Sequence, residues 1–159
     1  MQRPIVGSGE CMAQVIPGLI AGAVGTTALN IATYLDMVVR GRPPSSTPER
    51  SVQRLAEIVG LDLGKGEEAE NRTSGLAAVL GYATGLGGGV AYALLVRRRL
   101  PWPAATAILT GLTMAASSIP MTLLGVTDPR RWSAADWTAD VLFHVSYGAA
   151  AAAAYERVR

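Results

Sequence analysis

Three long stretches of the chain contain almost no ionisable side chains. Residues 11–35, 73–96 and 100–127 form runs of 25, 24 and 28 residues with no acid or base apart from Cys11 and tyrosines. A helix of about 20 mostly apolar residues crosses the ~30 Å hydrocarbon core of a bilayer, and lipid strongly excludes charged side chains. The pattern therefore predicts membrane-spanning helices over about 12–39, 74–97 and 103–124.

A fourth predicted helix, over about 134–156, is less uniform. It begins at Ser133 and Asp136, which have the spacing of a capping box, and it carries Asp140 and the only histidine, His144. Its charge-free part, 141–155, has 15 residues, or about 22 Å of helix. We predict an all-α polytopic membrane protein: one membrane domain, 1–159, built as a four-transmembrane-helix bundle with both termini on one side.

The segment between the first two spans has a different periodicity. Val52, Leu55, Ala56 and Val59 recur at helical spacing between Pro48 and Gly60, which predicts a short amphipathic helix over about 48–59. The spacing of Ser46 and Glu49 predicts a capping box at its start. This helix either lies on the membrane surface, covers the loop side of the bundle or docks a partner. We expect the polar residues 64–73 that follow to form a mobile loop.

Small residues mark two of the predicted spans. The first has Gly18 and Gly22 on one side, with Asp36 on the same side and Asn30 at its edge. The second contains two consecutive Gly-x-x-x-Gly steps, at Gly81, Gly85 and Gly89. Glycines at this spacing let helix backbones approach closely in a membrane. The residues predicted to pack helices together are Gly18, Gly22, Gly81, Gly85 and Gly89.

Composition adds limits on function. The net charge is +2 and 50% of the residues are hydrophobic, and the arginines are not interleaved with stacking aromatics, so we expect no nucleic-acid partner. One cysteine permits no intrachain disulfide and no thiolate cluster. A cleavable signal peptide ending near Ala21 is an alternative for the N-terminus, but the charge-free run continues to Leu35, which favours a full span.

The last predicted helix concentrates the polar side chains on one face: Asp136, Asp140, His144, Tyr147, Ala151 and Tyr155 are spaced 4, 4, 3, 4 and 4 residues apart. We expect Asp140 and His144, one turn apart, to form a hydrogen bond or an ion pair. The predicted intramembrane polar cluster consists of Asn30, Asp36, Asp140, His144 and Tyr147, with Asn30, Thr33 or Tyr34 as partners from the first helix.

Three interpretations of this cluster remain open. A satisfied structural hydrogen bond is favoured over proton or ion handling, and both are favoured over a metal site. The possible metal ligands are Asp36, Asp136, Asp140 and His144, and a single histidine does not favour zinc. No serine lies in a Gly-x-Ser-x-Gly turn and Cys11 has no neighbouring histidine in sequence, so we expect no enzyme activity, no cofactor and no metal.

Four stretches of the chain resemble the YagU-like family of small bacterial inner-membrane proteins. They are GLIAGAVG at 18–25, RPPSSTP at 42–48, IPMTLLGVTDP at 119–129, and the part from Trp137 to FHVSY at 143–147. The resemblance implies a multi-helix inner-membrane protein without an assigned biochemical activity.

Together these features predict a non-catalytic accessory or scaffold subunit that acts through helix packing, with lipid and with copies of itself or other membrane proteins as partners. The alternative is a small proton- or ion-linked transporter or channel that uses the Asp140 and His144 face. Arg3, the turn at 97–99, Arg157 and Arg159 favour cytoplasmic termini, although arginines also flank the opposite ends.

Overall fold

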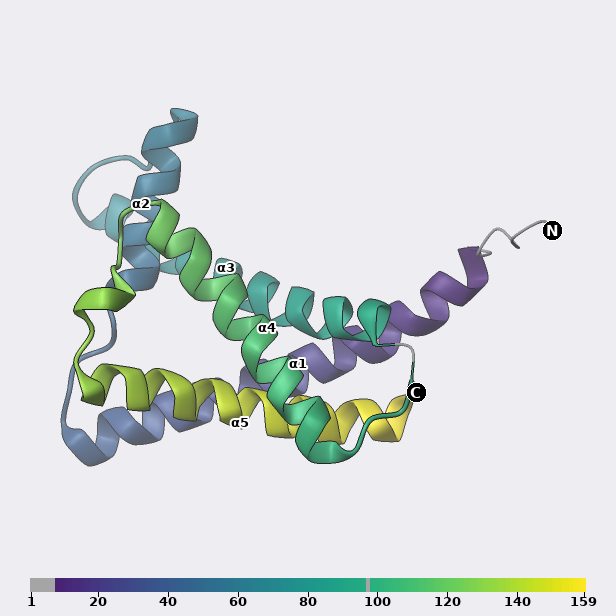
Figure 1. The fold of residues 1–159 in the computed structure, drawn as a ribbon. Helices are drawn as coiled ribbons and strands as arrows, with labels where there is room; N and C mark the ends of the chain where they lie inside the picture. Colours follow the sequence, from purple (N-terminus) through teal and green to yellow (C-terminus); the bar gives the residue numbers. More distant parts are fainter. Residues whose placement is uncertain (1–7, 97) are drawn as a thin grey trace.

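The computed structural model describes residues 8–96 and 98–159, which form five α-helices, one 3₁₀ turn and no strand (Figure 1). The sequence predictions that involve Arg3 and Arg97 concern residues outside this range. In chain order the elements are α1 (Ser8–Arg40), α2 (Thr47–Val59), α3 (Gly66–Leu95), α4 (Trp102–Leu123), η1 (Pro129–Arg131) and α5 (Ala134–Val158).

Three of these helices are long and apolar enough to cross a membrane, namely α1 from Met12 onward, α3 and α4. Many of their outward-facing side chains are large and aliphatic, as at Ile31, Leu95 and Leu123. Such faces suit lipid, where helices satisfy every backbone hydrogen bond internally. The predicted all-helical class is confirmed, and three long apolar helices indicate a membrane protein.

The helix boundaries agree with the sequence predictions within a few residues except at the start of α3. This helix begins at Gly66, so most of the polar segment 64–73, expected as a mobile loop, is helical. Arg72 makes two contacts in this segment. Its guanidinium pairs with Glu68, one turn earlier, at 2.5 Å and also donates to the Leu63 carbonyl at 3.1 Å, and an ion pair at this spacing supports a helix.

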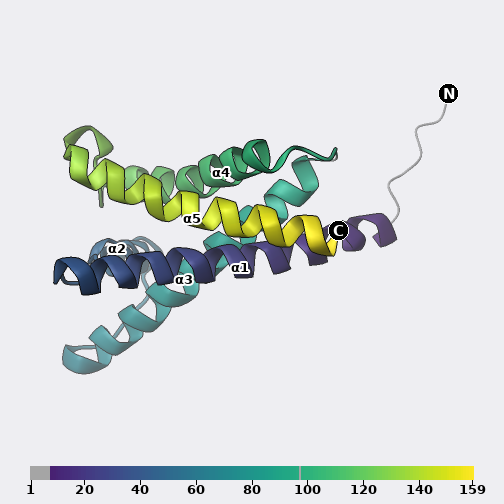
Figure 2. The same cartoon turned by 90° about the horizontal axis from the view of Figure 1, so that it is seen from below.

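The helices pack around α1 and α5. Helix α1 lies against both α3 and α5, whereas α4 packs on α5 and on the last part of α3 (Figure 1). The view in Figure 2 shows that the first half of α3 diverges from the other long helices. The long helices therefore pack closely around the second half of α3, and its first half diverges from them.

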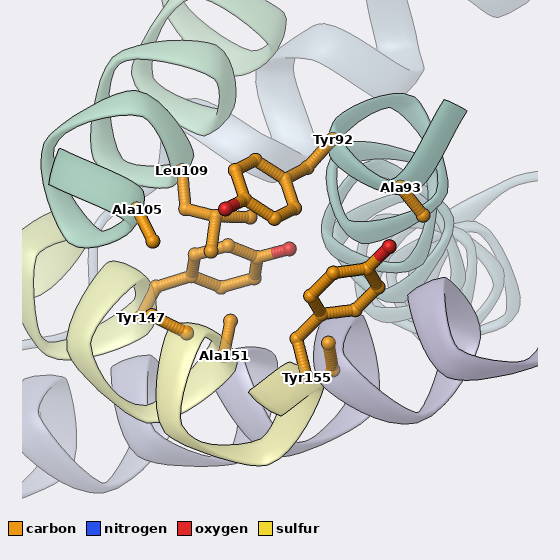
Figure 3. Packing of buried hydrophobic residues seen from close by; sticks show 9 residues of the cluster. Tyr92, Ala93, Ala105, Leu109, Tyr147, Ala151 and Tyr155 are labelled. Atoms are coloured by element: carbon orange, nitrogen blue, oxygen red, sulfur yellow. The ribbon is translucent and has the colours of Figure 1, made fainter. Parts of the chain in front are cut away.

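The core contains few large side chains. Tyr92, Leu109 and Tyr147 are almost fully buried, and most of their buried neighbours are alanines (Figure 3). Tyr92 and Tyr155 meet edge to face with ring centroids 5.2 Å apart, an arrangement that aromatic rings favour. Small residues around a few rings allow the helix axes to come close.

Helix α2 covers α3, which is one of the three alternatives left open by the sequence. Val52 and Ala56 are buried, and α2 contacts α3. Gly60 ends the helix in a left-handed conformation with φ of 69°, as its position predicted. The predicted capping box at the start of α2 is wrong, because the Ser46 side chain makes no capping hydrogen bond.

Candidate functional site

The first turn of α5 orients the polar face that follows it. The Ser133 hydroxyl accepts a hydrogen bond from the Asp136 amide at 3.2 Å, and the Asp136 carboxylate accepts one from the Ser133 amide at 3.0 Å. This capping box was predicted from the sequence. Hydrogen bonds from the Ser133 side chain and backbone lower the pKa of Asp136, a fully exposed carboxylate that lies before the apolar part of α5. The cap fixes where α5 begins and so which residues face α4.

His144 lies buried between α5 and α4. Its Nδ1 is 2.8 Å from the Asp140 backbone carbonyl and 3.4 Å from the Asp140 Oδ1, while its Nε2 is 3.3 Å from the Ser117 Oγ of α4. The expected pairing of Asp140 with His144 is therefore present. The partner from another helix is Ser117, rather than Asn30, Thr33 or Tyr34 of α1.

The partners of the imidazole determine its protonation pattern. Both oxygens near Nδ1 are acceptors, so Nδ1 carries a proton and donates. In the neutral ring Nε2 is then an acceptor, and it accepts a hydrogen bond from the Ser117 hydroxyl. The same hydroxyl also lies 3.0 Å from the Thr113 carbonyl and 3.1 Å from the Met114 carbonyl.

Asp140 is only partly satisfied. Its Oδ1 faces His144, but its Oδ2 is buried and has no hydrogen-bond partner among the described residues. The side chain as a whole is 24% exposed. Within the described residues, the hydrogen-bonding capacity of Oδ2 is therefore unused.

Tyr147, one turn further along α5, ties three helices together. Its hydroxyl donates to the Gly85 carbonyl of α3 at 2.5 Å, and the side chain is 1% exposed. Its ring fills the space beside Gly25 of α1, where a Cβ atom would lie 2.7 Å from the ring carbons. Tyr147 belongs to the predicted cluster, and its position indicates a structural role.

Four of the five glycines predicted to pack helices do so, in an antiparallel contact between α1 and α3. A Cβ on Gly18 would lie 2.8 Å from the Val90 Cα, and one on Gly22 would lie 2.7 Å from the Gly85 carbonyl oxygen. Gly89 sits against the backbone of Gly18 and Gly22 in the same way. Gly81 differs, because a Cβ there would meet nothing within 4 Å.

Asn30 and Asp36 are not brought to His144. The Asp36 carboxylate accepts from the Arg42 Nε at 2.5 Å and lies 3.7 Å from the Arg40 guanidinium. Arg42 also lies over the Phe143 ring, 5.8 Å from its centroid. Asp36 thus pairs with arginines at the end of α1. Asn30 is half-buried on α1.

The sequence prediction missed the contribution of α4. Besides Ser117, the Thr110 hydroxyl of α4 donates to the His144 backbone carbonyl at 3.3 Å. Thr110, Thr113 and Ser117 are spaced three and four residues apart, which places them on one helix face. That spacing inside an apolar span was the signal that could have identified α4 as the partner.

The arrangement can hold or relay a proton but lacks the ligand set of a metal centre. Among the side chains of residues 12–96 and 98–159, no group of three His, Cys, Asp or Glu is close enough to hold a metal ion. Comparison with protein families, curated proteins and solved structures finds no match to this chain. Function must therefore be argued from the residues themselves.

Proposed function

We propose that this protein is a non-catalytic subunit of the bacterial inner membrane that associates, through α3, with another copy of itself or with a different membrane protein. The observation that carries this proposal is the open stretch of α3. Every residue from 78 to 83 is exposed, including Tyr82 and Val79, and a Cβ on Gly81 would meet nothing. The resemblance to the YagU-like family agrees with a membrane protein that has no assigned chemistry.

The chemistry of this stretch favours a protein neighbour over lipid. A glycine in a membrane helix lets another backbone approach closely, and the apolar side chains beside it add packing area. The same glycine spacing already supports the contact of Gly85 and Gly89 with α1. Gly81 continues that motif onto the part of α3 that α1 leaves uncovered (Figure 2).

The proposal includes four membrane spans. Helix α5 has 25 residues, or about 37 Å, and it lies along α1. Its outward side chains include Leu142 and Val145, while His144 and Tyr147 are buried against the other helices. We propose that α5 crosses the membrane with Asp140 near one border, and that the ends bearing Arg98, Arg99 and Arg159 are cytoplasmic. A reporter fused after Arg159 that fluoresces only in the cytoplasm tests this orientation.

Mass measurement of the full chain after gentle solubilisation tests the association. We expect a stable oligomer or a complex of defined composition for the unmodified protein. The Gly81→Leu variant should lose at least about nine-tenths of this assembly, because the added side chain blocks backbone approach. Gly111→Leu is the matched control, since a Cβ on this α4 glycine also meets nothing. An entirely monomeric unmodified protein, or equal assembly of all three proteins, contradicts the proposal.

The second candidate function is proton- or ion-linked transport at Asp140 and His144. The Asp140 Oδ2, which has no hydrogen-bond partner among the described residues, lies next to a histidine whose Nε2 is 3.3 Å from the Ser117 hydroxyl, and this arrangement favours the alternative. Proton flux into proteoliposomes should then fall by about tenfold or more in Asp140→Asn and His144→Ala, because each removes a proton carrier. Unchanged flux in both variants eliminates transport through this cluster.

A further inference from the structure

A pocket lies at the opposite end of the bundle from α2, where α1 begins and α3 and α5 end. It is open to the surface and has a volume of about 340 Å³. Ala13 and Pro17 of α1, Ala93 and Val96 at the end of α3, and Tyr155 of α5 form its apolar walls. Figure 3 shows Tyr155 and Ala93 facing each other across neighbouring helices at this end. The pocket is separate from the Asp140 and His144 cluster.

Two arginines line this pocket, together with the polar side chain of Gln14. Arg99 comes from the connection after α3 and is exposed, and Arg159 follows the end of α5 with a side chain only 14% exposed. The Arg159 guanidinium stacks over the Tyr155 ring, 5.3 Å from its centroid. That stacking directs the charged group along the pocket wall.

The Arg159 guanidinium has hydrogen-bond donors without an acceptor among the described residues. Its Nε and Nη2 atoms are buried and have no hydrogen-bond partner within the described part of the chain. The Glu156 Oε1 is 2.7 Å from Nη2, close enough for an ion pair but outside hydrogen-bond geometry. With Nη2 beside Glu156, the Arg159 guanidinium contributes positive charge to the pocket wall. Arg99 and Arg159 line the pocket, and Glu156 is the acidic side chain paired with Arg159. These three side chains together carry an excess positive charge.

We infer that this pocket binds the phosphate headgroup of an anionic phospholipid. The two arginines supply charge and planar donors for the phosphate, and the apolar walls suit the carbons next to it. Its volume of about 340 Å³ lies at the lower end of the ~300–1,000 Å³ range of ligand pockets, which leaves room for a phosphate and its glycerol carbons. The exposed Ile16 and Leu95 of α1 and α3 provide an apolar surface for the acyl chains.

A lipid explains the pocket better than free phosphate does. Inorganic phosphate would use only the arginines and leave the walls formed by Ala13, Pro17 and Val96 in contact with water. The pocket also lies just where the apolar helix α3 ends and α4 has yet to begin, which is the depth of lipid headgroups. The arginines therefore match the charged headgroup of an amphiphile, and the apolar walls match its hydrocarbon part.

Native mass spectrometry of the full chain in micelles containing equal amounts of phosphatidylglycerol and phosphatidylcholine tests this inference. We expect phosphatidylglycerol to bind preferentially. The Arg99→Gln/Arg159→Gln variant should weaken that binding about thirty-fold, from the usual contribution of two basic residues at an anionic membrane surface. Arg130→Gln/Arg131→Gln removes equal charge at the other end of the bundle and should bind as the unmodified protein does.

A second variant leaves both arginines in place. Ala13→Leu adds three carbons to an exposed residue of the pocket wall and should reduce phosphatidylglycerol binding by filling the pocket. The inference is overturned if the two lipids bind equally, if the two arginine variants lose binding equally, or if both pocket variants bind as the unmodified protein does. It is also overturned if millimolar inorganic phosphate displaces the lipid, since the walls would then contribute nothing.

Discussion

The contact between α1 and α3 allows a direct test of how closely these helices approach. In Gly22→Ala the new Cβ would lie 2.7 Å from the Gly85 carbonyl oxygen and 2.8 Å from the Leu86 Cα, whereas ordinary contact begins at 3.4 Å. Both neighbours are backbone atoms, so no side chain can rotate away. The two helices must separate by about 0.6 to 0.7 Å, which forfeits a quarter to a half of the attraction between the facing atoms.

The magnitude follows from comparison with Gly81→Ala. Overpacking of this kind destabilises by about 1–3 kcal/mol, while replacing a helical glycine by alanine contributes about 0.5–1 kcal/mol of stability. In a single chain Gly81→Ala gains the second effect without the first, because its Cβ meets nothing of that chain within 4 Å, so both variants are compared as detergent-separated monomers. The difference between the two variants cancels helix propensity. We expect Gly22→Ala to be less stable than Gly81→Ala by about 2 kcal/mol.

Reversible unfolding by sodium dodecyl sulfate in mixed micelles, followed by tryptophan fluorescence and circular dichroism, measures this difference. Gly89→Ala should behave like Gly22→Ala, because its Cβ would lie 2.6 Å from the Gly22 backbone nitrogen. Equal unfolding free energies for Gly22→Ala and Gly81→Ala, with equal helix content, would refute the close antiparallel contact.

Two further predictions concern α5. Tyr147→Phe removes the hydroxyl that donates to Gly85 and keeps the ring; the unfolding free energy in the same assay should fall by about 1 kcal/mol, and an unchanged value would show that the hydrogen bond contributes nothing. Ser133→Ala removes the N-cap, and we expect a loss of about 1 kcal/mol. The Ser133 side chain is the main cause of the lowered pKa of Asp136. The Asp136 carboxylate therefore stabilises the folded state at pH values above its ordinary pKa near 3.9, and this stabilisation disappears as the pH falls through the lowered pKa. The unmodified protein should therefore lose stability at acidic pH by this route, and Ser133→Ala should show less of that loss; parallel pH profiles for the two proteins would contradict it.

The sequence alone was sufficient to predict the helices that a lipid environment or local capping favours. Charge-free runs of 24 residues or more leave the backbone no partner in a bilayer except itself, so helices follow at α1, α3 and α4. The start of α5 and the end of α2 were also predictable, because Ser133 and Gly60 act on the few residues next to them. The early start of α3 was missed because residues 66–73 have no apolar periodicity, and the contacts of Arg72 with Glu68 and Leu63 are not visible in a hydrophobic pattern.

Partners between helices were decided by the tertiary structure. Gly81, Gly85 and Gly89 share one sequence motif, but only Gly85 and Gly89 lie where α1 crosses α3, since two helices meet over a short length and then diverge. The pairing of Asp140 with His144 was predictable because both lie on one helix. The third member, Ser117 of α4, depended on how α4 packs against α5, and residue spacing within a single helix carries no information about that.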